Sequence, residues 1–396
     1  MTIRALHLVK TSDGATWAAR QAAVLVGLGI EVHVAVPARD GRCMPLWQES
    51  GAIIHVADTA LDPRRPWRLL EQVRKLQGLV DGIRPDLVHA HFVANAMLMR
   101  LALRSRPALA RLFQVPGPLH LEHGLTRRAE IATASAPDRW IASSRYIRDL
   151  YVRAGVPAQR VSLSYYGTDI AAISPRRTGV LRRRLGIADD VKMVGNISWM
   201  YPPKRWLGQR VGLKCHEDLI SALGEVISRN PKVVGVLAGG GWNGAAWYER
   251  RLQDMAAAIG GGRIILLGPL DDAEVRDAWA DFDLVVHVPS SENCGGVIEP
   301  LLAGVPVIAT RVGGLPEVIR PGVTGTLVPP RSPRELAGAI ESSLSRLVDQ
   351  RGMAAAGKAL VSEMFAIDRT AAQVARIYRR IVQGRAARSA DVCEMD

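Results

Sequence analysis

The sequence lacks the features that identify most secreted, membrane-spanning and zinc-binding proteins. Its four cysteines are scattered without a CxxC pair, so neither a disulfide framework nor a cysteine zinc site is expected. A transmembrane helix needs about 18 consecutive apolar residues, and Arg20 and Glu31 interrupt the best candidate run. The apolar part of the first segment, MTIRALHLVKTSDG, is too short for a signal peptide. We therefore expect a cytoplasmic protein that can also sit peripherally on the inner face of a membrane.

Negative charge is scarce relative to positive charge. The chain has 51 Lys and Arg residues against 38 Asp and Glu residues, with a formal net charge of +13 and a pI near 10.1. Such a surplus points to anionic partners, namely nucleic acid, anionic lipid or polyanionic substrates. The hydrophobic share of 48% is ordinary for a globular protein, and 396 residues suffice for two domains. No nucleophile elbow, P-loop or Ser-His-Asp ordering occurs in the sequence.

Short apolar strands alternate with helices along the chain, which predicts two successive α/β domains with parallel sheets and right-handed crossovers. The first domain is expected over 1–172 and the second over 178–365, because a proline-containing linker over 173–177 interrupts the alternation. Residues 385–396 are expected to be a loose tail. Strands are expected at 5–9, 30–36, 52–56, 87–91, 119–123, 140–142, 191–197, 233–238, 264–268 and 284–288.

The most informative stretch runs from Pro289 to Ile319, directly after an apolar strand. A small-residue loop, CGG at 294–296, lies between two acids, Glu292 and Glu299. A strand, a glycine loop and a helix in this order present free backbone N–H groups to which a phosphate can bind. A phosphate site alone would not need the two acids. They indicate a polyol, such as a ribose or a sugar, beside the phosphates.

Two other patterns suggest a different chemistry. GGGWNG at 239–244 matches the GxGxxG pattern of dinucleotide-binding loops, and Asp271 follows the next strand, where such folds keep a ribose-binding acid. A tight strand-to-helix turn of any α/β sheet explains the same glycines. Asp281 and Asp283 form a DxD pattern, which can hold a divalent metal. Because they run straight into an apolar strand, we expect them to cap or precede it and predict no metal site there.

Basic residues gather in three segments. The loop over 197–213 interleaves cations with two tryptophans and a Pro-Pro pair. Such a loop can bind nucleic acid, wrap a nucleotide sugar, touch lipid headgroups, or be an ordered surface loop. Further basic segments lie at 64–68 and 97–112. The latter reads, up to Pro107, either as an amphipathic helix for an anionic surface or as a solvated helix face. Its cations are Arg100, Arg104, Arg106 and Arg111.

Histidines end several expected strands of the first domain, where parallel sheets bind their ligands. His123 precedes Gly124, where the chain reverses, and is therefore the best candidate for a functional histidine. A lone buried histidine is usually structural, so His89 and His91 rank lower.

The stretch over 289–319 resembles the nucleotide-sugar site of GT-B glycosyltransferases of the family 4 type, which are retaining enzymes. LHLVKTSDGATWAARQAAVLVGLGIEVHVAVP resembles the first strand, glycine loop and helix of that family. VHAHF and HLEHGL resemble its N-domain crevice strands, YYGTDI its domain junction, and LKCHEDLISAL its phosphate-binding segment. MFAIDRTAAQVARIYRRIV resembles the C-terminal helix, here 366–384, that crosses back to the first domain. The resemblance implies two Rossmann-like domains that face a cleft.

The resemblance also implies which residues bind the donor. Glu299 would bind the donor ribose, and the N–H groups of Gly295, Gly296 and Val297 would approach the diphosphate and the sugar. Lys214 and a helix N-terminus would stabilise the departing nucleoside diphosphate without a metal.

In the first domain, His123 would match the histidine that contacts the transferred sugar, and Gly14 would match a glycine near the diphosphate. The chain departs from the family pattern at its two acids. One fewer residue than usual separates Glu292 from Glu299, so either Ser291 or Glu292 fills the role of the first acid.

A second departure concerns a phosphate-binding arginine. The family places this arginine after a strand-end glycine, where the present chain has Asn196. Arg205 or Arg210, in the loop that follows, would supply the missing cation.

The sequence therefore predicts a retaining, metal-independent glycosyltransferase with His123, Lys214 and Glu292 as catalytic residues. It would move a sugar from a nucleoside-diphosphate donor to a hydroxyl of a glycan or lipid-linked glycan. The acceptor would bind the first domain, whose basic surplus suits a membrane-borne or anionic acceptor; neither a cofactor nor nucleic acid is expected. The alternatives are an NAD-dependent oxidoreductase using 239–244 and a non-catalytic GT-B-like binding protein.

Overall fold

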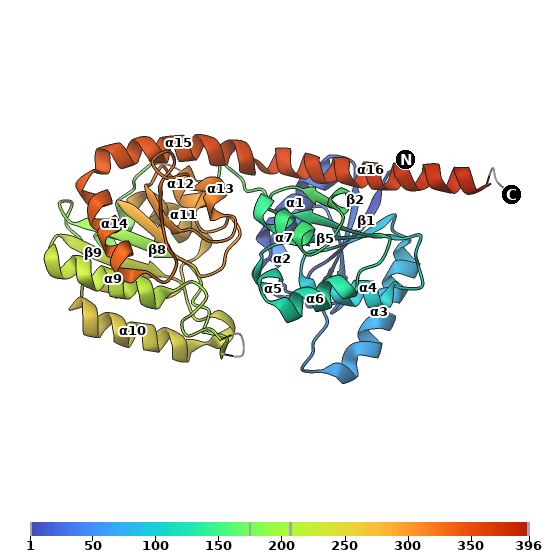
Figure 1. Cartoon of the computed structure of the whole chain (residues 1–396), viewed down its shortest axis with the longest axis horizontal. Coiled ribbons are helices and arrows are strands. Elements are labelled where there is room, and N and C mark those ends of the chain that lie inside the picture. Colours follow the sequence, from blue (N-terminus) through green and yellow to red (C-terminus); the bar gives the residue numbers. More distant parts are fainter. Residues whose placement is uncertain (1, 174–175, 206–207, 394–396) are drawn as a thin grey trace. The chain divides into compact units, whose positions relative to one another are not determined.

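The computed structural model describes residues 2–173, 176–205 and 208–393. The chain forms two compact units, each built on one parallel sheet with its helices (Figure 1). Unit 1 combines Met1–Thr168 with Met364–Asp396, and unit 2 is Asp169–Glu363. Trp206, one of the two tryptophans in the loop over 197–213, lies outside the described residues. In the described part of the chain, no helix is long and apolar enough to cross a membrane.

The sheet of unit 1 has the strand order β3-β2-β1-β4-β5-β6-β7, with parallel pairing between neighbours. The order changes direction between β1 and β4, so the loops that follow these two strands border the crevice in which such sheets bind ligands. The strands are β1 (Arg4–Leu8), β2 (Glu31–Val36), β3 (Ile53–Val56), β4 (Leu87–Ala90), β5 (Ala110–Val115), β6 (Asp138–Ala142) and β7 (Val161–Leu163).

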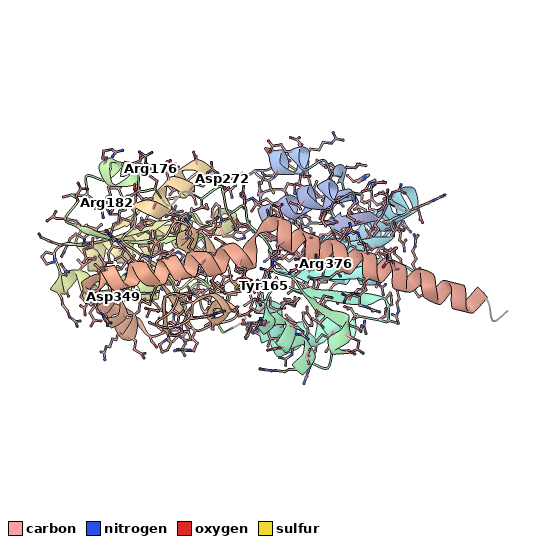
Figure 2. The ribbon with its side chains drawn as sticks, turned by 90° about the horizontal axis from the view of Figure 1, so that it is seen from above. Tyr165, Arg176, Arg182, Asp272, Asp349 and Arg376 are labelled. Atoms are coloured by element: carbon pink, nitrogen blue, oxygen red, sulfur yellow. The ribbon has the colours of Figure 1, made fainter. Side chains whose placement is uncertain are left out.

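Helices follow these strands in alternation, and a final helix, α16 (Ile367–Cys393), returns to unit 1 and packs along α1 (Figures 1 and 2). Tyr378 of α16 is buried in the unit 1 core. α16 reaches Cys393, within the predicted loose tail, because that segment is rich in Ala and Arg and has no Pro. The other helices are α1 (Thr16–Gly27), α2 (Met44–Glu49), η1 (Pro66–Arg68), α3 (Leu69–Ile83), α4 (Val93–Ala102), α5 (Leu119–Glu122), α6 (Gly124–Ala132), α7 (Arg145–Arg153) and η2 (Ala158–Arg160).

The prediction of a strand at 119–123 is wrong. These residues form α5 and the turn after it, and the strand of this region is β5, whose residues ARLFQV are all buried. Pro118 directly precedes α5, where its fixed φ suits the start of a helix.

The prediction that the basic segment over 97–112 is a helix up to Pro107 is also wrong in part. The helix there, α4, ends at Ala102, and two of the four arginines in this segment are buried. Arg100 pairs with Glu130 at 2.7 Å, and Arg111 pairs with Asp138 at 2.8 Å. A buried arginine needs such a carboxylate partner, so these two cations stabilise unit 1 and are not exposed to an anionic surface.

The sheet of unit 2 has the order β10-β9-β8-β11-β12-β13, the doubly wound order of nucleotide-binding folds, with its switch point between β8 and β11. The strands are β8 (Lys192–Ile197), β9 (Val233–Ala238), β10 (Ile264–Leu266), β11 (Leu284–His287), β12 (Val307–Thr310) and β13 (Thr326–Val328). The helices are α8 (Val180–Arg184), α9 (His216–Arg229), η4 (Trp242–Gly244), α10 (Ala246–Gly260), α11 (Asp272–Asp281), α12 (Ile298–Leu302), α13 (Leu315–Val318), α14 (Pro333–Ser345) and α15 (Leu347–Phe365).

The two acids of the DxD pattern hold α8 against the sheet of unit 2. The Asp281 carboxylate accepts hydrogen bonds from the N–H groups of Gly179 (2.6 Å) and Leu181 (2.9 Å), at the start of α8. The Asp283 carboxylate pairs with the buried guanidinium of Arg182, which Figure 2 labels. Both carboxylates thus have a structural role. They precede β11, as the sequence predicts, but the element that Asp281 caps is α8.

Candidate functional site

The loops that follow β8 and β11 meet at the switch point of the unit 2 sheet. The N–H and the hydroxyl of Ser290 both donate to the carbonyl oxygen of Leu213, at 2.9 and 3.2 Å. This contact fixes the end of the β8 loop against the β11 loop. Lys214, the residue after Leu213, therefore lies beside Glu292 of the second loop.

The backbone of Glu292 is held from its other side by a glycine turn. The N–H of Gly314 donates to the Glu292 carbonyl oxygen at 3.3 Å. A Cβ on Gly313 would lie 1.6 Å from that oxygen, and Gly313 also has a left-handed φ of 54°. Only glycine fits at that position, so the turn at 313–314 sets the position of the acid.

Three donors converge on the Glu292 side chain. The ammonium of Lys214 forms an ion pair with it, His287 Nε2 lies 3.3 Å from Oε2, and the N–H of Asn293 lies 3.0 Å from Oε1. Burial by itself would raise the pKa of Glu292, but the charge of Lys214 and the hydrogen bond from His287 lower it to about 2. Burial lowers the pKa of His287. The site thus holds an ionised carboxylate at neutral pH.

The glycine loop lies directly over His287. Gly296 has a left-handed φ of 76°, and a Cβ there would lie 2.3 Å from the His287 ring. Gly295 has ordinary space, with the nearest atom to a Cβ, Glu292 Oε1, at 3.7 Å. Only the second of the two glycines is therefore required by the local packing.

Val297 and Glu299 follow the glycine loop at the start of α12. Val297 is the residue before the helix and is fully buried, and Glu299 lies in the first turn. Trp279 of α11 donates its indole N–H to Glu299 Oε2 at 3.2 Å, which sets the orientation of that carboxylate.

Asn196, which stands where the family resemblance implies an arginine, begins a hydrogen-bond chain. Its amide donates to the carbonyl oxygen of Val286 (2.7 Å), and its Oδ1 accepts from the Ser198 hydroxyl (2.8 Å). Because the proton of Ser198 is used there, His216 Nε2 donates to the Ser198 oxygen (3.1 Å). Burial lowers the pKa of His216 to about 3, which keeps its ring neutral. Asn196 therefore supports the loop and brings no positive charge.

The remaining predicted donor residues differ in their exposure. Ser291 is buried beside Glu292, and it is Glu292 that contacts Lys214. Arg205 and Arg210, the two candidate phosphate cations, are both exposed on the β8 loop.

The GGGWNG loop after β9 packs on the loop after β8. Trp242 lies 5.5 Å from Trp199 and 5.2 Å from Tyr201, measured between ring centroids. A Cβ on Gly239 would lie 2.0 Å from the carbonyl oxygen of Ser198. Glycine at this position therefore lets the two loop backbones come close together. The described part of the loop over 197–213 is thus ordered by its aromatic packing.

Asp271, which would bind the ribose if 239–244 were a dinucleotide-binding loop, is a helix cap. Its carboxylate accepts from the N–H groups of Ala273 and Glu274, and Glu274 returns a hydrogen bond to the N–H of Asp271. In this reciprocal capping box, the Asp271 carboxylate stabilises the first turn of α11.

Gly14 and His123 belong to unit 1. Gly14 lies in the loop between β1 and α1, but the left-handed residue of that loop is Ala15, with a φ of 67°. His123 is half-buried and precedes α6, and its carbonyl oxygen accepts from Arg127 N–H (2.9 Å) and the Thr126 hydroxyl (3.0 Å). These bonds fix the backbone of His123 at the turn.

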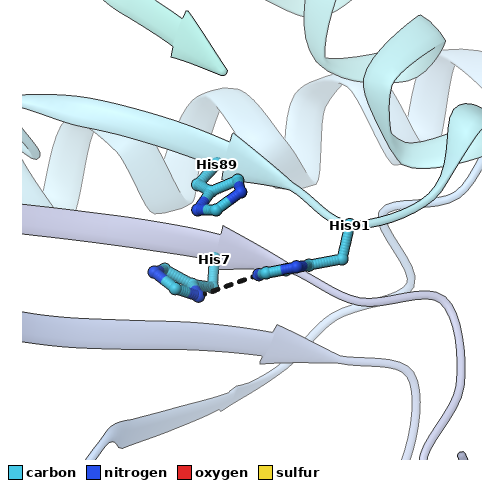
Figure 3. A group of neighbouring side chains, drawn as sticks. All are labelled: His7, His89 and His91. Carbon is cyan, nitrogen blue, oxygen red and sulfur yellow. Dashed lines mark hydrogen bonds between the residues drawn. The ribbon is translucent and has the colours of Figure 1, made fainter. Parts of the chain in front are cut away.

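Unit 1 contains a cluster of three buried histidines, His7, His89 and His91, at the ends of β1 and β4 (Figure 3). One ring nitrogen from each histidine lies within 4.8 Å of the other two, a spacing at which three imidazoles can bind one metal ion. Two tyrosine hydroxyls, however, already bind the rings: Tyr378 contacts His7 Nε2 (3.0 Å) and His89 Nδ1 (2.5 Å), and Tyr166 contacts His91 Nδ1 (3.0 Å).

The direction of these hydrogen bonds follows from one fixed end. The Tyr166 hydroxyl donates to the carbonyl oxygen of Gln114 (3.1 Å), which can only accept. For neutral rings, His91 Nδ1 must then donate to Tyr166, His7 Nδ1 to His91 Nε2, Tyr378 to His7 Nε2, and His89 Nδ1 to Tyr378. Burial lowers the pKa of all three histidines, which supports neutral rings. The cluster therefore ties α16 to the sheet. Of the six ring nitrogens of His7, His89 and His91, only His89 Nε2 has no hydrogen-bond partner among the described residues.

Sequence reasoning missed His287, Ser198, His216 and Tyr378. His287 had a visible signal, because it is the one polar residue of the apolar strand LVVHV at 284–288. The other three act through contacts between distant segments, which the sequence does not show.

Comparisons with known proteins agree with this architecture. Residues 14–172 match the family model "Glycosyltransferase Family 4", and residues 206–346 match the model "Glycosyl transferases group 1". A D-inositol 3-phosphate glycosyltransferase of Thermobispora bispora is 26% identical over 394 residues, covering 91% of this chain and 87% of the relative.

Two solved structures share the fold over both units. HepE of Anabaena, crystallised with UDP and glucose, has a TM-score of 0.80 at 23% identity and covers 96% of this chain and 100% of its own. Sucrose-phosphate synthase from Thermosynechococcus elongatus has a TM-score of 0.78 at 20% identity, with the same coverage of both chains. These likenesses, with the two sheet orders, define the GT-B fold of glycosyltransferases.

The two family models together extend over most of the chain. The chain belongs to the family 4 type of these glycosyltransferases. It is a glycosyltransferase, and the comparisons give no support to the oxidoreductase or the non-catalytic alternative.

Proposed function

We propose that this glycosyltransferase moves a sugar from a nucleoside-diphosphate donor to a hydroxyl of a glycan or lipid-linked acceptor, with retention and without a metal. The observation that carries the proposal is the pairing of Lys214 with the ionised carboxylate of Glu292 beneath the Gly295-Gly296 loop, at the switch point of unit 2. Parallel sheets bind nucleotides at such points.

The phosphate end of the donor would lie by Lys214. This residue directly precedes Cys215, the N-cap of α9, a helix of 14 residues whose first N–H groups attract anions. A departing diphosphate gathers negative charge, and a fixed ammonium and helix N-terminus would stabilise it in the transition state. Arg205 and Arg210 are exposed cations that a donor could recruit. The chain therefore supplies positive charge of its own, which motivates metal independence.

The sugar and ribose would meet the two acids. The Glu299 carboxylate, oriented by Trp279, would accept the ribose hydroxyls, and Glu292 or Ser291 would hold the hydroxyls of the transferred sugar. The N–H groups of Gly296 and its neighbours would approach the diphosphate. Gly14 and His123 in unit 1 are proposed, from the family resemblance, to approach the diphosphate and the transferred sugar.

A screen of nucleotide sugars for hydrolysis and transfer tests the proposal. UDP-glucose is the first donor to try, because HepE was crystallised with it. D-inositol 3-phosphate is the first acceptor, because it is the substrate named for the Thermobispora bispora relative. We expect the anomeric configuration of the product, read by NMR, to match that of the donor, and EDTA to leave the rate unchanged. Inversion would refute retention, and loss of activity with EDTA that added metal restores would refute metal independence.

A peripheral membrane contact is proposed for the segment around η1. Trp67 is 74% exposed and Leu70 is 68% exposed, and the exposed Arg64 and Arg65 precede them. Exposed apolar side chains beside cations suit an anionic membrane surface. Sedimentation with phosphatidylglycerol vesicles should fall for Trp67→Ala but not for Trp247→Ala, whose tryptophan in unit 2 is 53% exposed. Equal binding by both variants and the wild type would refute the contact.

A further inference from the structure

We propose that His287 is a positioning residue that holds the Glu292 carboxylate in place while Lys214 turns to the diphosphate of the donor. The inference rests on the proposed function of Lys214 and Glu292. It adds a third residue to their pair, one that lies on a strand and not on either loop.

The donors to Glu292 differ in how freely they can move. The Lys214 side chain is 16% exposed and has a flexible four-carbon stem, so its ammonium can move from one anion to another. The His287 side chain is 2% exposed and lies on the buried strand β11. Its ring is also covered by Gly296, where even a Cβ would collide with it. His287 therefore keeps its place when a ligand enters, and Lys214 is free to adjust.

The donor-free state leaves Lys214 paired with Glu292. A diphosphate carries more negative charge than one carboxylate, so it draws the ammonium away from Glu292. A carboxylate that is mostly buried is costly to leave without donors. The hydrogen bonds from His287 Nε2 and Asn293 N–H would then keep Glu292 satisfied and aimed at the donor sugar.

The protonation state of His287 suits this role. A carboxylate oxygen only accepts, so the imidazole proton that faces Glu292 must sit on Nε2. Because burial lowers the pKa of His287, the ring is neutral at neutral pH. It thus donates to Glu292 without a second positive charge that would compete with Lys214.

Two substitutions separate positioning from mere packing. His287→Phe keeps a ring of similar size but removes the donor, and His287→Gln keeps an N–H donor at a similar reach. We expect His287→Phe to lower kcat for the preferred nucleotide sugar by about 10- to 100-fold, the range for a lost hydrogen bond to a charged group. KM for the donor and the affinity for UDP alone, measured by calorimetry, should change by less than about threefold, because the nucleotide is held elsewhere. His287→Gln should recover most of kcat.

The matched control is His55→Gln, a partly exposed histidine on the β3 strand of unit 1, which should retain wild-type kinetics. If His287→Phe does not fold, His287→Asn replaces it, because the shorter amide cannot reach Glu292. Equal losses of kcat in the Gln and Phe variants, or a parallel loss of UDP affinity, would overturn the positioning role. An active wild type with an equally active His287→Phe variant would overturn it too, and would leave the proposed function standing. A wild type that neither binds UDP nor turns over any nucleotide sugar would overturn the proposed function, and the inference with it.

Discussion

Glu292→Gln should reduce the stability of the protein in a way that depends on pH. The substitution keeps the shape of the side chain and removes the charge that pairs with Lys214. The pKa of Glu292 is about 2 in the folded protein, against an ordinary value of 4.5. A pKa lowered on folding contributes stability that is complete above the unfolded value and is lost as the pH falls through the folded value. By this linkage the full contribution is about 3 kcal/mol, of which about 2 kcal/mol is lost between pH 7 and pH 3.

The assay is urea unfolding followed by circular dichroism at several pH values between 7 and 3. The wild type should lose about 2 kcal/mol more than Glu292→Gln over this range, so the difference between the two proteins should shrink as the pH falls. Glu341→Gln, which alters an exposed pair with Arg229, serves as the control and should follow the wild type. A difference between wild type and Glu292→Gln that stays constant from pH 7 to pH 3 would refute the reasoning.

Three further predictions concern stability and turnover. Tyr378→Phe removes a hydroxyl shared by two buried histidines and should lower the free energy of unfolding by about 2–5 kcal/mol; the change should be smaller for the less buried Tyr146→Phe, and equal changes would contradict the proposed network. Asp271→Ala should cost about 1 kcal/mol as a lost helix cap and leave nucleotide-sugar turnover intact, whereas lost turnover would point to a ligand-binding role. Gly313→Ala should lower turnover at least about tenfold, because its Cβ would collide with the carbonyl oxygen of Glu292; full activity would show that the turn can relax.

The alternation of apolar strands and helices was enough to predict two α/β domains. It failed locally at β5, because Arg111 in that strand reads as part of a basic segment. Only the position of Asp138, 27 residues later, makes this arginine compatible with a buried strand. Periodicity reports which residues are apolar, and it cannot report that a cation will meet a distant carboxylate.

The candidate donor site was predictable where its chemistry lies in one stretch. The two acids and the glycine loop occur together at 292–299, so their proximity follows from the sequence. The contact of Ser290 with Leu213 joins segments that are 77 residues apart, and no local sequence pattern predicts it. Likewise, the packing role of the GGGWNG loop rests on the contacts of Trp242 with Trp199 and Tyr201. Both residues lie about 40 positions from Trp242 in the sequence, so the sequence alone does not show the contact.

The central claim is that Lys214 and Glu299 bind the donor in unit 2. Calorimetric titration with UDP, together with transfer rates for the preferred donor, tests it most directly. Lys214→Ala and Glu299→Ala should each abolish transfer and weaken UDP binding while leaving the fold intact. Lys232→Ala and Glu341→Ala, which alter exposed ion pairs of the same unit, should behave as the wild type. Wild-type UDP affinity and wild-type transfer rates in both site variants would contradict the account.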